Sequence, residues 1–299
     1  MLNREEILKI SPKALFDEPM SNHTSFKIGG SADAFVSVES KDEIKALIAY
    51  CKENDVPYLI MGNGSNMLVG DGGIRGVVIQ IGSGMQHCEA DGEMVYAEAG
   101  VLMSKLANVI LRAELTGFET LCGIPGTLGG GIYMNAGAYG GEIKDVVTEV
   151  TYLTSDGEFV TAKNADLDFA YRHSIFCDKN YVILSALLKL TKGNYDEIKA
   201  SMSDYNKRRN DKQPINMPSA GSTFKRPDGY FAGKLIQDCG LMGYTIGGAQ
   251  VSEKHAGFIV NIGGATAADI LALIQHVQAV VKRETGVDLE PEVKIMGEG

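Results

Sequence analysis

The sequence lacks several patterns that would each point to a particular class of protein. Its five cysteines are odd in number and form no CxxC pair or closely spaced metal-ligand group. We therefore expect reduced, mostly buried thiols and no metal site, as in a cytoplasmic protein. The first ten residues, MLNREEILKI, mix acidic and basic side chains and lack the apolar core of a signal peptide, so no export is expected.

Basic residues are also scarce relative to acidic ones. The 299 residues include 28 Lys and Arg against 38 Asp and Glu, a formal net charge of −10. Such a chain repels nucleic acids and anionic membranes unless a local basic patch compensates, and the sequence contains none. We expect no nucleic-acid partner, while an anionic small substrate is compatible with a few cations lining a pocket.

One uncharged stretch has the length of a membrane span. Residues 120–141 carry no charge, but eight of these 22 residues are glycine and one is Pro125. This composition predicts a loop system rather than a lipid-facing helix, so no membrane span is expected.

Apolar periodicity predicts a mixed α+β fold. Residues 41–55 place Ile44, Leu47, Ile48 and Cys51 at the spacing of an amphipathic helix, and a buried strand is expected at 56–61. Thr266 is expected to cap a helix that ends at Gly286. Further strands are expected at 77–81, 94–97, 147–153, 158–161, 181–190 and 291–296, and further helices at 103–114 and 195–213.

The length predicts two domains, because single cores stop growing near this size. We place the boundary near residue 197, where a charged, helix-like segment follows a strong strand, which gives domains of 1–197 and 198–299. The first domain is expected to contain two subdomains divided near residue 86.

A first glycine-rich segment, 62–66, leaves the strand expected at 56–61. Its glycines permit close backbone approach, and successive N–H groups there can bind an anion; a tight turn is the alternative. The segment is not a Rossmann fingerprint, because Met67 stands where a third glycine belongs and an extended chain follows it. It is not a P-loop either.

A second glycine-rich run spans 123–131 and 135–141. Its little side-chain bulk exposes main chain and suits a large flat ligand, whereas the alternative is an irregular surface loop. An apolar segment of this kind gains little from contact with water, which favours the ligand-binding interpretation.

These two runs, together with 22–30, resemble the FAD-binding domain of the vanillyl-alcohol-oxidase-like (PCMH-type) flavoproteins. More narrowly, the chain is similar to the UDP-N-acetylenolpyruvoylglucosamine reductase family, also called UDP-N-acetylmuramate dehydrogenases, in its compact subtype. The similarity spans 19–297 and continues through YRHSIF at 171–176, SAGSTFKRP at 219–227, IGGAQVS at 246–252, KHAGF at 254–258 and LEPEV at 289–293.

The resemblance implies a two-subdomain FAD domain followed by a smaller α+β substrate domain. It implies reduction of UDP-N-acetylglucosamine enolpyruvate to UDP-N-acetylmuramate, a peptidoglycan precursor, with NADPH as electron donor and FAD as cofactor. Neither 62–66 nor 123–135 contains a His or Cys to which the flavin could be attached, so non-covalent FAD is expected.

Three residues receive catalytic roles from this resemblance. Arg172 would hold the substrate carboxylate, Ser222 would donate a proton, and Glu292 would support the developing enol. Physical chemistry agrees, because hydride addition to the vinyl carbon leaves negative charge beside the carboxylate, which a guanidinium stabilises, and then one proton is needed. Without the resemblance, Ser222 would be interpreted as a turn residue and Arg172 and Glu292 as solvated charges.

The resemblance also implies ligand contacts. Lys212, Arg226 and His255 are the expected substrate contacts, whereas His173 is expected to be a structural imidazole. Met242 stands where the family usually has a lysine that meets the diphosphate. The expected FAD contacts are Gly62, Asn63, Gly64, Ser65, Asn66, Gly123, Ile124, Gly126, Thr127, Gly130, Asn135, Ala136 and Gly137.

Two other functions fit the same motifs. A flavin oxidase of this fold would predict a covalent flavin link through His or Cys. A non-catalytic nucleotide-binding regulator would predict that NADPH leaves bound flavin unchanged.

Overall fold

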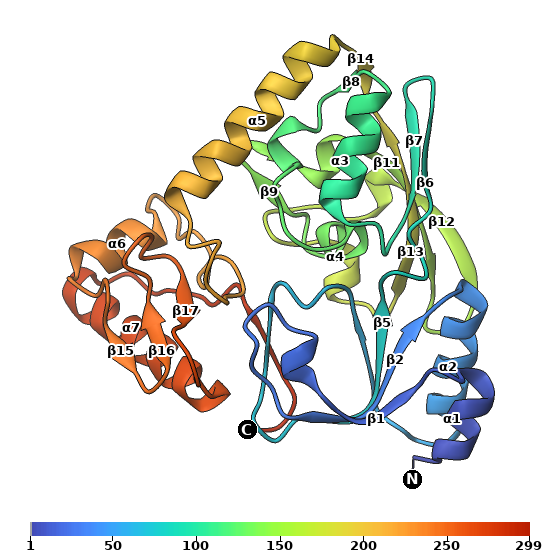
Figure 1. Cartoon of the computed structure of the whole chain (residues 1–299), viewed down its shortest axis with the longest axis horizontal. Coiled ribbons are helices and arrows are strands. Elements are labelled where there is room, and N and C mark those ends of the chain that lie inside the picture. Colours follow the sequence, from blue (N-terminus) through green and yellow to red (C-terminus); the bar gives the residue numbers. More distant parts are fainter. Residues whose placement is uncertain (1) are drawn as a thin grey trace. The chain divides into compact units, whose positions relative to one another are not determined.

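The computed structural model describes residues 2–299, which form two compact units (Figure 1). The first unit comprises 2–15, 35–63 and 77–209, and the second comprises 16–34, 64–76 and 210–299. Each unit is thus assembled from three separate stretches, whereas the sequence analysis expected one boundary near residue 197. That residue lies inside helix α5 (Tyr195–Lys212). The ligand that each domain binds stays a proposal.

The first unit contains a small sheet next to two N-terminal helices, α1 (Arg4–Ile10) and α2 (Lys41–Glu53). Strand β3 (Tyr58–Met61) runs parallel to β5 (Ile74–Ile81). Ser40 caps α2, and all four apolar residues of the predicted stripe are buried, which confirms that helix. Strands β1 (Leu15–Pro19) and β2 (Ser31–Val38) complete the sheet, in the order β1-β2-β5-β3. The boundary between the units falls within β1, β2 and β5, so only part of this sheet belongs to the first unit.

A five-stranded antiparallel sheet forms the rest of the first unit's framework, in the order β12-β11-β13-β7-β6. Its strands are β6 (Cys88–Asp91), β7 (Met94–Glu98), β11 (Val147–Leu153), β12 (Phe159–Lys163) and β13 (Val182–Lys189). Asp91-Gly92 and Asp156-Gly157 lie in the turns that join β6 to β7 and β11 to β12, and Gly92 and Gly157 adopt positive φ angles of 60° and 82° there.

The remaining short elements of the first unit connect its sheets. They are α3 (Met103–Arg112), α4 (Leu128–Tyr133), β8 (Leu115–Thr116), β14 (Thr191–Lys192), β9 (Gly137–Ala138), β10 (Gly141–Glu142) and the 3₁₀ turns η2 (Glu119–Leu121), η3 (Ile143–Asp145), η4 (Asn164–Asp166) and η5 (Ile175–Cys177). The predicted helix at 103–114 is confirmed as α3.

The uncharged stretch 120–141 was predicted to be a loop system, and this is only partly right because it contains helix α4. Thr127 caps this helix by accepting the N–H of Gly130, a local signal that offsets the low helix propensity of glycine. The helix has six residues. Nowhere in 2–299 does the structure contain a helix long and apolar enough to cross a membrane.

The second unit packs two helices, α6 (Ala232–Asp238) and α7 (Ala267–Thr285), with an antiparallel three-stranded sheet (Figure 1). The strands are β15 (Thr245–Ile246), β16 (Ala249–Val251) and β17 (Ile259–Asn261). Thr266 and Asp269 form a capping box at the start of α7, and Gly286 ends the helix with a φ of 75°. The predicted cap and stop of this helix are confirmed.

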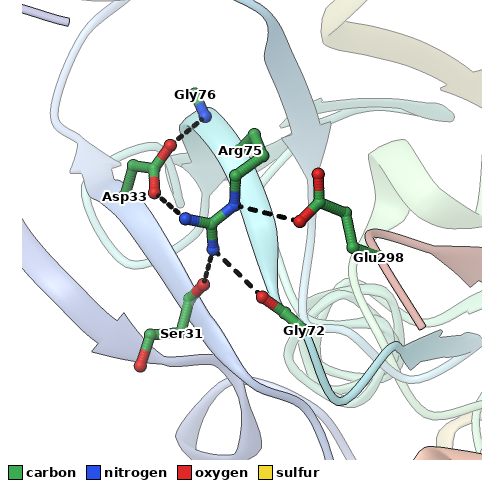
Figure 2. Close-up of polar contacts among 6 residues, drawn as sticks. All are labelled: Ser31, Asp33, Gly72, Arg75, Gly76 and Glu298. Carbon is green, nitrogen blue, oxygen red and sulfur yellow. Dashed lines mark hydrogen bonds and ion pairs between the residues drawn. The ribbon is translucent and has the colours of Figure 1, made fainter.

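The second unit also takes in two segments from the first third of the chain. Strand β18 (Lys294–Met296) pairs in parallel with β4 (Met67–Val69), and η1 (Met20–Asn22) belongs to the same unit. Figure 2 shows how Arg75 fastens this arrangement: its guanidinium forms an ion pair with Asp33, donates to the carbonyls of Ser31 (3.0 Å) and Gly72 (3.1 Å), and lies 3.6 Å from Glu298. Asp33 in turn accepts the N–H of Gly76 at 2.8 Å.

All five cysteines are free thiols. Cys51 and Cys122 are buried, but Cys88, Cys177 and Cys239 are half-buried, so the expectation of mostly buried thiols is right for only two. Burial raises the pKa of both Cys51 and Cys88 to about 11. These two thiols are therefore protonated at neutral pH and poor nucleophiles.

Candidate active site

Ser222 and Glu292, 70 positions apart in the sequence, lie on adjacent segments of the second unit. Thr223, next to Ser222, accepts the N–H of Glu292 on its carbonyl at 2.8 Å, and Lys225 donates its N–H to Glu290 at 2.8 Å. Thr223 is itself held by the carbonyl of Gly257 and by Ile259, whose N–H it accepts on Oγ1. The main-chain pairing therefore sets the spacing between the predicted proton donor and the predicted carboxylate.

Asn66 connects the first glycine-rich segment to this pair. Its side-chain amide donates to the carbonyl of Glu292 (3.2 Å), and its own carbonyl accepts the N–H of Lys294 (3.0 Å). The same register continues in the parallel pairing of β4 with β18. Asn66, predicted as a cofactor contact, thus also holds the chain that carries Glu292.

Ser25 was missed by the sequence analysis as an individual residue. Its N–H and hydroxyl contact the carbonyl of Gly64 (3.1 and 3.3 Å), and its hydroxyl reaches the carbonyl of Ser219 at 2.6 Å. It therefore joins the first glycine-rich segment to the segment that leads to Ser222. Its position within the 22–30 motif was the available signal, but no pattern identified the partner carbonyls.

Arg172 lies in the first unit, at the tip of a two-residue hairpin. Ala170 and His173 exchange main-chain hydrogen bonds of 3.1 and 3.2 Å across the hairpin stem, and Arg172 has a φ of 54°. Its guanidinium donates to the carbonyl of Gly137 (3.3 Å) and lies 5.0 Å from the ring of Tyr171. The positive φ angle of a non-glycine residue is a strained conformation of the kind found at functional sites.

Residues of the two glycine-rich segments meet inside the first unit. A Cβ atom on Gly62 would lie 2.4 Å from the side-chain oxygen of Thr127, so only glycine permits this approach. Gln80 also donates to the carbonyl of Gly62 at 3.3 Å. Gly126 has a φ of 109°, another conformation that L side chains rarely adopt. The chain passes from one unit to the other between Asn63 and Gly64, within the first segment.

The second glycine-rich run offers fewer backbone donors than its sequence predicted. The N–H groups of Leu128 and Gly129 donate to the carbonyls of Val101 and Ala99, and those of Gly130 and Gly131 donate to Thr127. The first turn of α4 therefore has its donors engaged within the protein. Gly130 is nevertheless exposed, and a Cβ atom there would meet only the Thr127 oxygen, at 3.7 Å.

Asn135 has a structural role that the sequence did not indicate. Its side chain is buried, donates to Glu142 (3.2 Å) and Ala170 (2.9 Å), and accepts the N–H of Lys144 (3.0 Å). The amide is thus occupied by protein partners, and it holds the hairpin of Arg172 through Ala170. Its main-chain N–H also has a protein partner, the carbonyl of Ile132 (3.1 Å).

Arg209 is a second residue that the sequence analysis missed. From α5, its half-buried guanidinium donates to the carbonyl of Gly123 at 2.6 Å, and burial lowers its pKa. A Cβ atom on Gly123 would lie 2.5 Å from the side chain of Asn206, also on α5. This long helix therefore shapes the second glycine-rich run, a role that its charged, helix-like sequence did not indicate.

The predicted substrate contacts lie in the second unit. His255 accepts the N–H of Gly257 on Nδ1 (3.1 Å), and burial lowers its pKa, so the neutral ring carries its proton on Nε2. Lys212 is exposed and close enough to contribute to that lowered pKa. Arg226 lies over the ring of Phe231, 4.0 Å from its centroid. Met242 is half-buried and packs against the core of this unit.

Comparisons with known proteins decide the family. Residues 213–296 match the model of the UDP-N-acetylenolpyruvoylglucosamine reductase C-terminal domain, and 32–163 match an FAD binding domain. The UDP-N-acetylenolpyruvoylglucosamine reductase of Caldanaerobacter subterraneus is 53% identical over 294 residues, covering 98% of this chain and 97% of the relative. The chain belongs to this reductase family.

Further similarity to the reductase family extends along the whole chain. The reductase of Clostridioides difficile is 52% identical over 282 residues, covering 94% of this chain and 93% of the relative. The crystal structure of the Thermus caldophilus reductase superposes with a TM-score of 0.81 at 34% identity and covers 95% of this chain and 98% of that one. The predicted family, the α+β fold and the flavin-dependent class of enzyme are confirmed. Arg172 and Lys212 lie outside both matched domains.

Proposed function

We propose that this chain uses NADPH and FAD to reduce UDP-N-acetylglucosamine enolpyruvate to UDP-N-acetylmuramate, a step of peptidoglycan synthesis, in the cytoplasm. The proposal depends chiefly on the 53% identity to the UDP-N-acetylenolpyruvoylglucosamine reductase of Caldanaerobacter subterraneus, which extends over nearly the full length of both chains. The main-chain hydrogen bond from Glu292 to Thr223, the neighbour of Ser222, supports it, because the reaction needs a proton donor and a group that organises the developing enol in one place. FAD binding is assigned to 1–197 and substrate binding to 198–299.

The glycine-rich segments fit the cofactor. The exposed face of Gly130 has room for an atom that no protein side chain fills, and Gly126 turns the chain where a side chain would be strained. The main chains of 62–66, 123–127 and 135–137 would hold FAD, non-covalently. Bound there, FAD would supply the transfer of a hydride from NADPH to the vinyl carbon of the substrate.

The chain's own groups then stabilise charge and move one proton. Hydride addition to the terminal vinyl carbon leaves an electron pair on the carbon bonded to the carboxylate and the ether oxygen. Arg172 would bind the carboxylate and stabilise the charge that spreads onto it. The Ser222 hydroxyl would give its proton to that carbon, completing addition of hydride and proton across the double bond, and would regain a proton from solvent.

A serine hydroxyl is a weak acid, but an enolate is a strong base, so the proton transfer is driven by the substrate. Glu292 would orient the enol. Its main-chain bonds to Thr223 and Asn66 fix its backbone beside Ser222. Lys212, Arg226 and neutral His255 would contact the UDP-sugar, with Lys212 and Arg226 supplying the charge that Met242 lacks for the diphosphate.

Separating the two half-reactions tests this assignment. Ser222→Ala removes the proton donor but no group that meets NADPH, so flavin absorbance should bleach with NADPH at the wild-type rate. Recovery of absorbance on adding the enolpyruvyl sugar should slow by at least the ~10²–10⁴ typical of one general acid. Anaerobic stopped-flow absorbance measures both steps.

Ser222→Cys is the matched control. A thiol is a stronger acid with a longer reach, so it should restore much of the recovery that alanine loses. Recovery at the wild-type rate in Ser222→Ala would assign the proton to another donor. A protein that binds no FAD, or whose flavin ignores NADPH, would contradict the proposed function itself.

A further inference from the structure

Three side chains of the first unit direct their polar atoms at one another around the hairpin of Arg172. The Nε2 atom of His173 lies 3.4 Å from a carboxylate oxygen of Asp168 and 3.5 Å from one of Asp178. The three donor atoms all fall within 4.8 Å of one another. Within 2–299, no other group of three or more His, Cys, Asp and Glu side chains brings its donor atoms this close.

The contact between His173 and Asp168 is a long hydrogen bond, at 3.4 Å. The chain contains a shorter histidine–carboxylate hydrogen bond between His23 and Glu18, at 2.9 Å. A single N–H on Nε2 cannot serve Asp168 and Asp178 equally, and both are farther away than the usual N–H···O distance. Two ligands of a tetrahedral ion bound at about 2.0–2.2 Å lie about 3.3–3.5 Å apart, which is the spacing seen here.

Charge and exposure also favour a bound cation. The side chains of Asp168 and Asp178 are 77% and 64% exposed, so they can rotate toward an ion. Two carboxylates that face one imidazole bring like charges together, and a divalent cation between them would offset that repulsion. One nitrogen and two oxygen ligands suit zinc, cobalt, nickel or copper better than magnesium or calcium, which prefer oxygen alone.

We propose that Asp168, His173 and Asp178 bind a divalent transition-metal ion, with the remaining coordination position open to water. Asp168 precedes the hairpin, His173 is part of it and Asp178 follows it. A bound ion would therefore link the two ends of the segment 168–178. Asp168 already has a φ of 47°, and the hairpin stem is closed by Ala170 and His173. Bound metal therefore stiffens the turn that presents Arg172.

The consequence for Arg172 rests on the proposed function, whereas metal binding itself does not. The test therefore measures binding. Untagged, flavin-loaded full-length protein is freed of metal with a chelator and titrated with zinc in a calorimeter. We expect one zinc ion per chain, and a dissociation constant at least about tenfold higher in His173→Gln and in Asp178→Asn.

His87→Gln is the matched control, because His87 is an exposed histidine 3.5 Å from a single carboxylate, Glu89. It should bind zinc like the wild type. Affinity should also fall at acid pH, since protons compete with metal for all three ligands. If His173→Gln loses its flavin or its helical circular dichroism signal, the zinc affinity of the isosteric variant Asp178→Asn tests the proposal instead.

Two results would overturn the proposal. One is the absence of saturable zinc binding below millimolar metal in the wild-type protein. The other is equal zinc affinity in the wild type, His173→Gln and Asp178→Asn, which would place the bound ion elsewhere and leave this cluster a set of surface ion pairs.

Discussion

Gly130 is an exposed helical residue within the matched FAD binding domain, and its free face is where a ligand can approach the main chain. Gly130→Ala should leave the free energy of unfolding unchanged or raise it by about 0.5–1 kcal/mol, because alanine favours helix and the new Cβ meets only Thr127 at 3.7 Å. The added methyl group should nevertheless weaken FAD binding. Titration of flavin-free protein with FAD measures this.

Gly129→Ala is the contrasting variant on the same helix. Its Cβ would lie 2.9 Å from the Cβ of Ala99, so it should lower the stability of the fold. Equal FAD affinity in Gly130→Ala and the wild type would remove this face of α4 from the cofactor site.

His255 makes the stability of the second unit depend on pH. Burial lowers its pKa below the ordinary 6.5, so the unfolded chain binds a proton first as pH falls. The contribution of the neutral ring is therefore fully present above about pH 6.5 and is lost as pH falls toward the folded pKa. Denaturant unfolding measures the free energy of unfolding near pH 7.5 and pH 5.5. The decrease between these two values should be smaller in His255→Gln than in the wild type. An unchanged acid loss would place the responsible group elsewhere.

At the scale of elements, helix α7 depends on its first turn. Thr266 accepts the N–H of Asp269 (3.1 Å), and the carboxylate of Asp71 accepts the N–H groups of Ala267 (2.8 Å) and Ala268 (3.0 Å). Thr266→Ala should reduce the free energy of unfolding by about 1 kcal/mol, as removal of a capping hydroxyl does. Thr266→Ser keeps the hydroxyl and should retain most of the stabilisation that the cap provides. Equal loss in both variants would point to the threonine methyl group instead.

Helix α4 shows the limit of element prediction from composition. Its sequence, LGGGIY, contains three glycines and favours a loop by propensity alone. The Thr127 cap and the acceptors offered by Ala99 and Val101 make one and a half turns of helix favourable there. These acceptors lie in the chain just after β7, which no local pattern connects to 128–133.

At the scale of the whole molecule, Arg75 joins three segments that are distant in sequence. Its partners Asp33, Gly72 and Glu298 span nearly the whole chain. Because β18 follows Glu292 directly and pairs with β4, this cluster supports the chain that carries the proposed catalytic carboxylate. The three segments all belong to the second unit.

Arg75→Ala should lower the free energy of unfolding of the second unit by about 1–2 kcal/mol, since it removes hydrogen bonds from a charged group to two carbonyls as well as ion pairs, all half exposed. Arg208→Ala is the control, because Arg208 is 56% exposed and pairs only along its own helix with Asp204. Urea unfolding of both variants measures the difference. Equal, small losses would show that the cluster contributes no more than a surface ion pair.

Local patterns by themselves determined most of the elements. The stripe of α2, the Asp-Gly hairpins and the cap and stop of α7 depend on residues within a few positions of one another, so periodicity and turn chemistry were sufficient. The family likewise followed from ordered motifs along the chain and is confirmed by the comparisons. The site residues carried over from that family remain proposals.

Only the tertiary structure decided which distant residues meet. The sequence analysis placed one boundary near 197, but each unit draws on three stretches. Strand β4 pairs with β18 across more than two hundred residues, and no local signal records such pairing. The same reason hid Ser25, Asn135 and Arg209, whose partners are carbonyl groups of remote loops. A carbonyl is present at every residue, so its choice as a partner depends on the folded backbone and leaves no trace in the sequence.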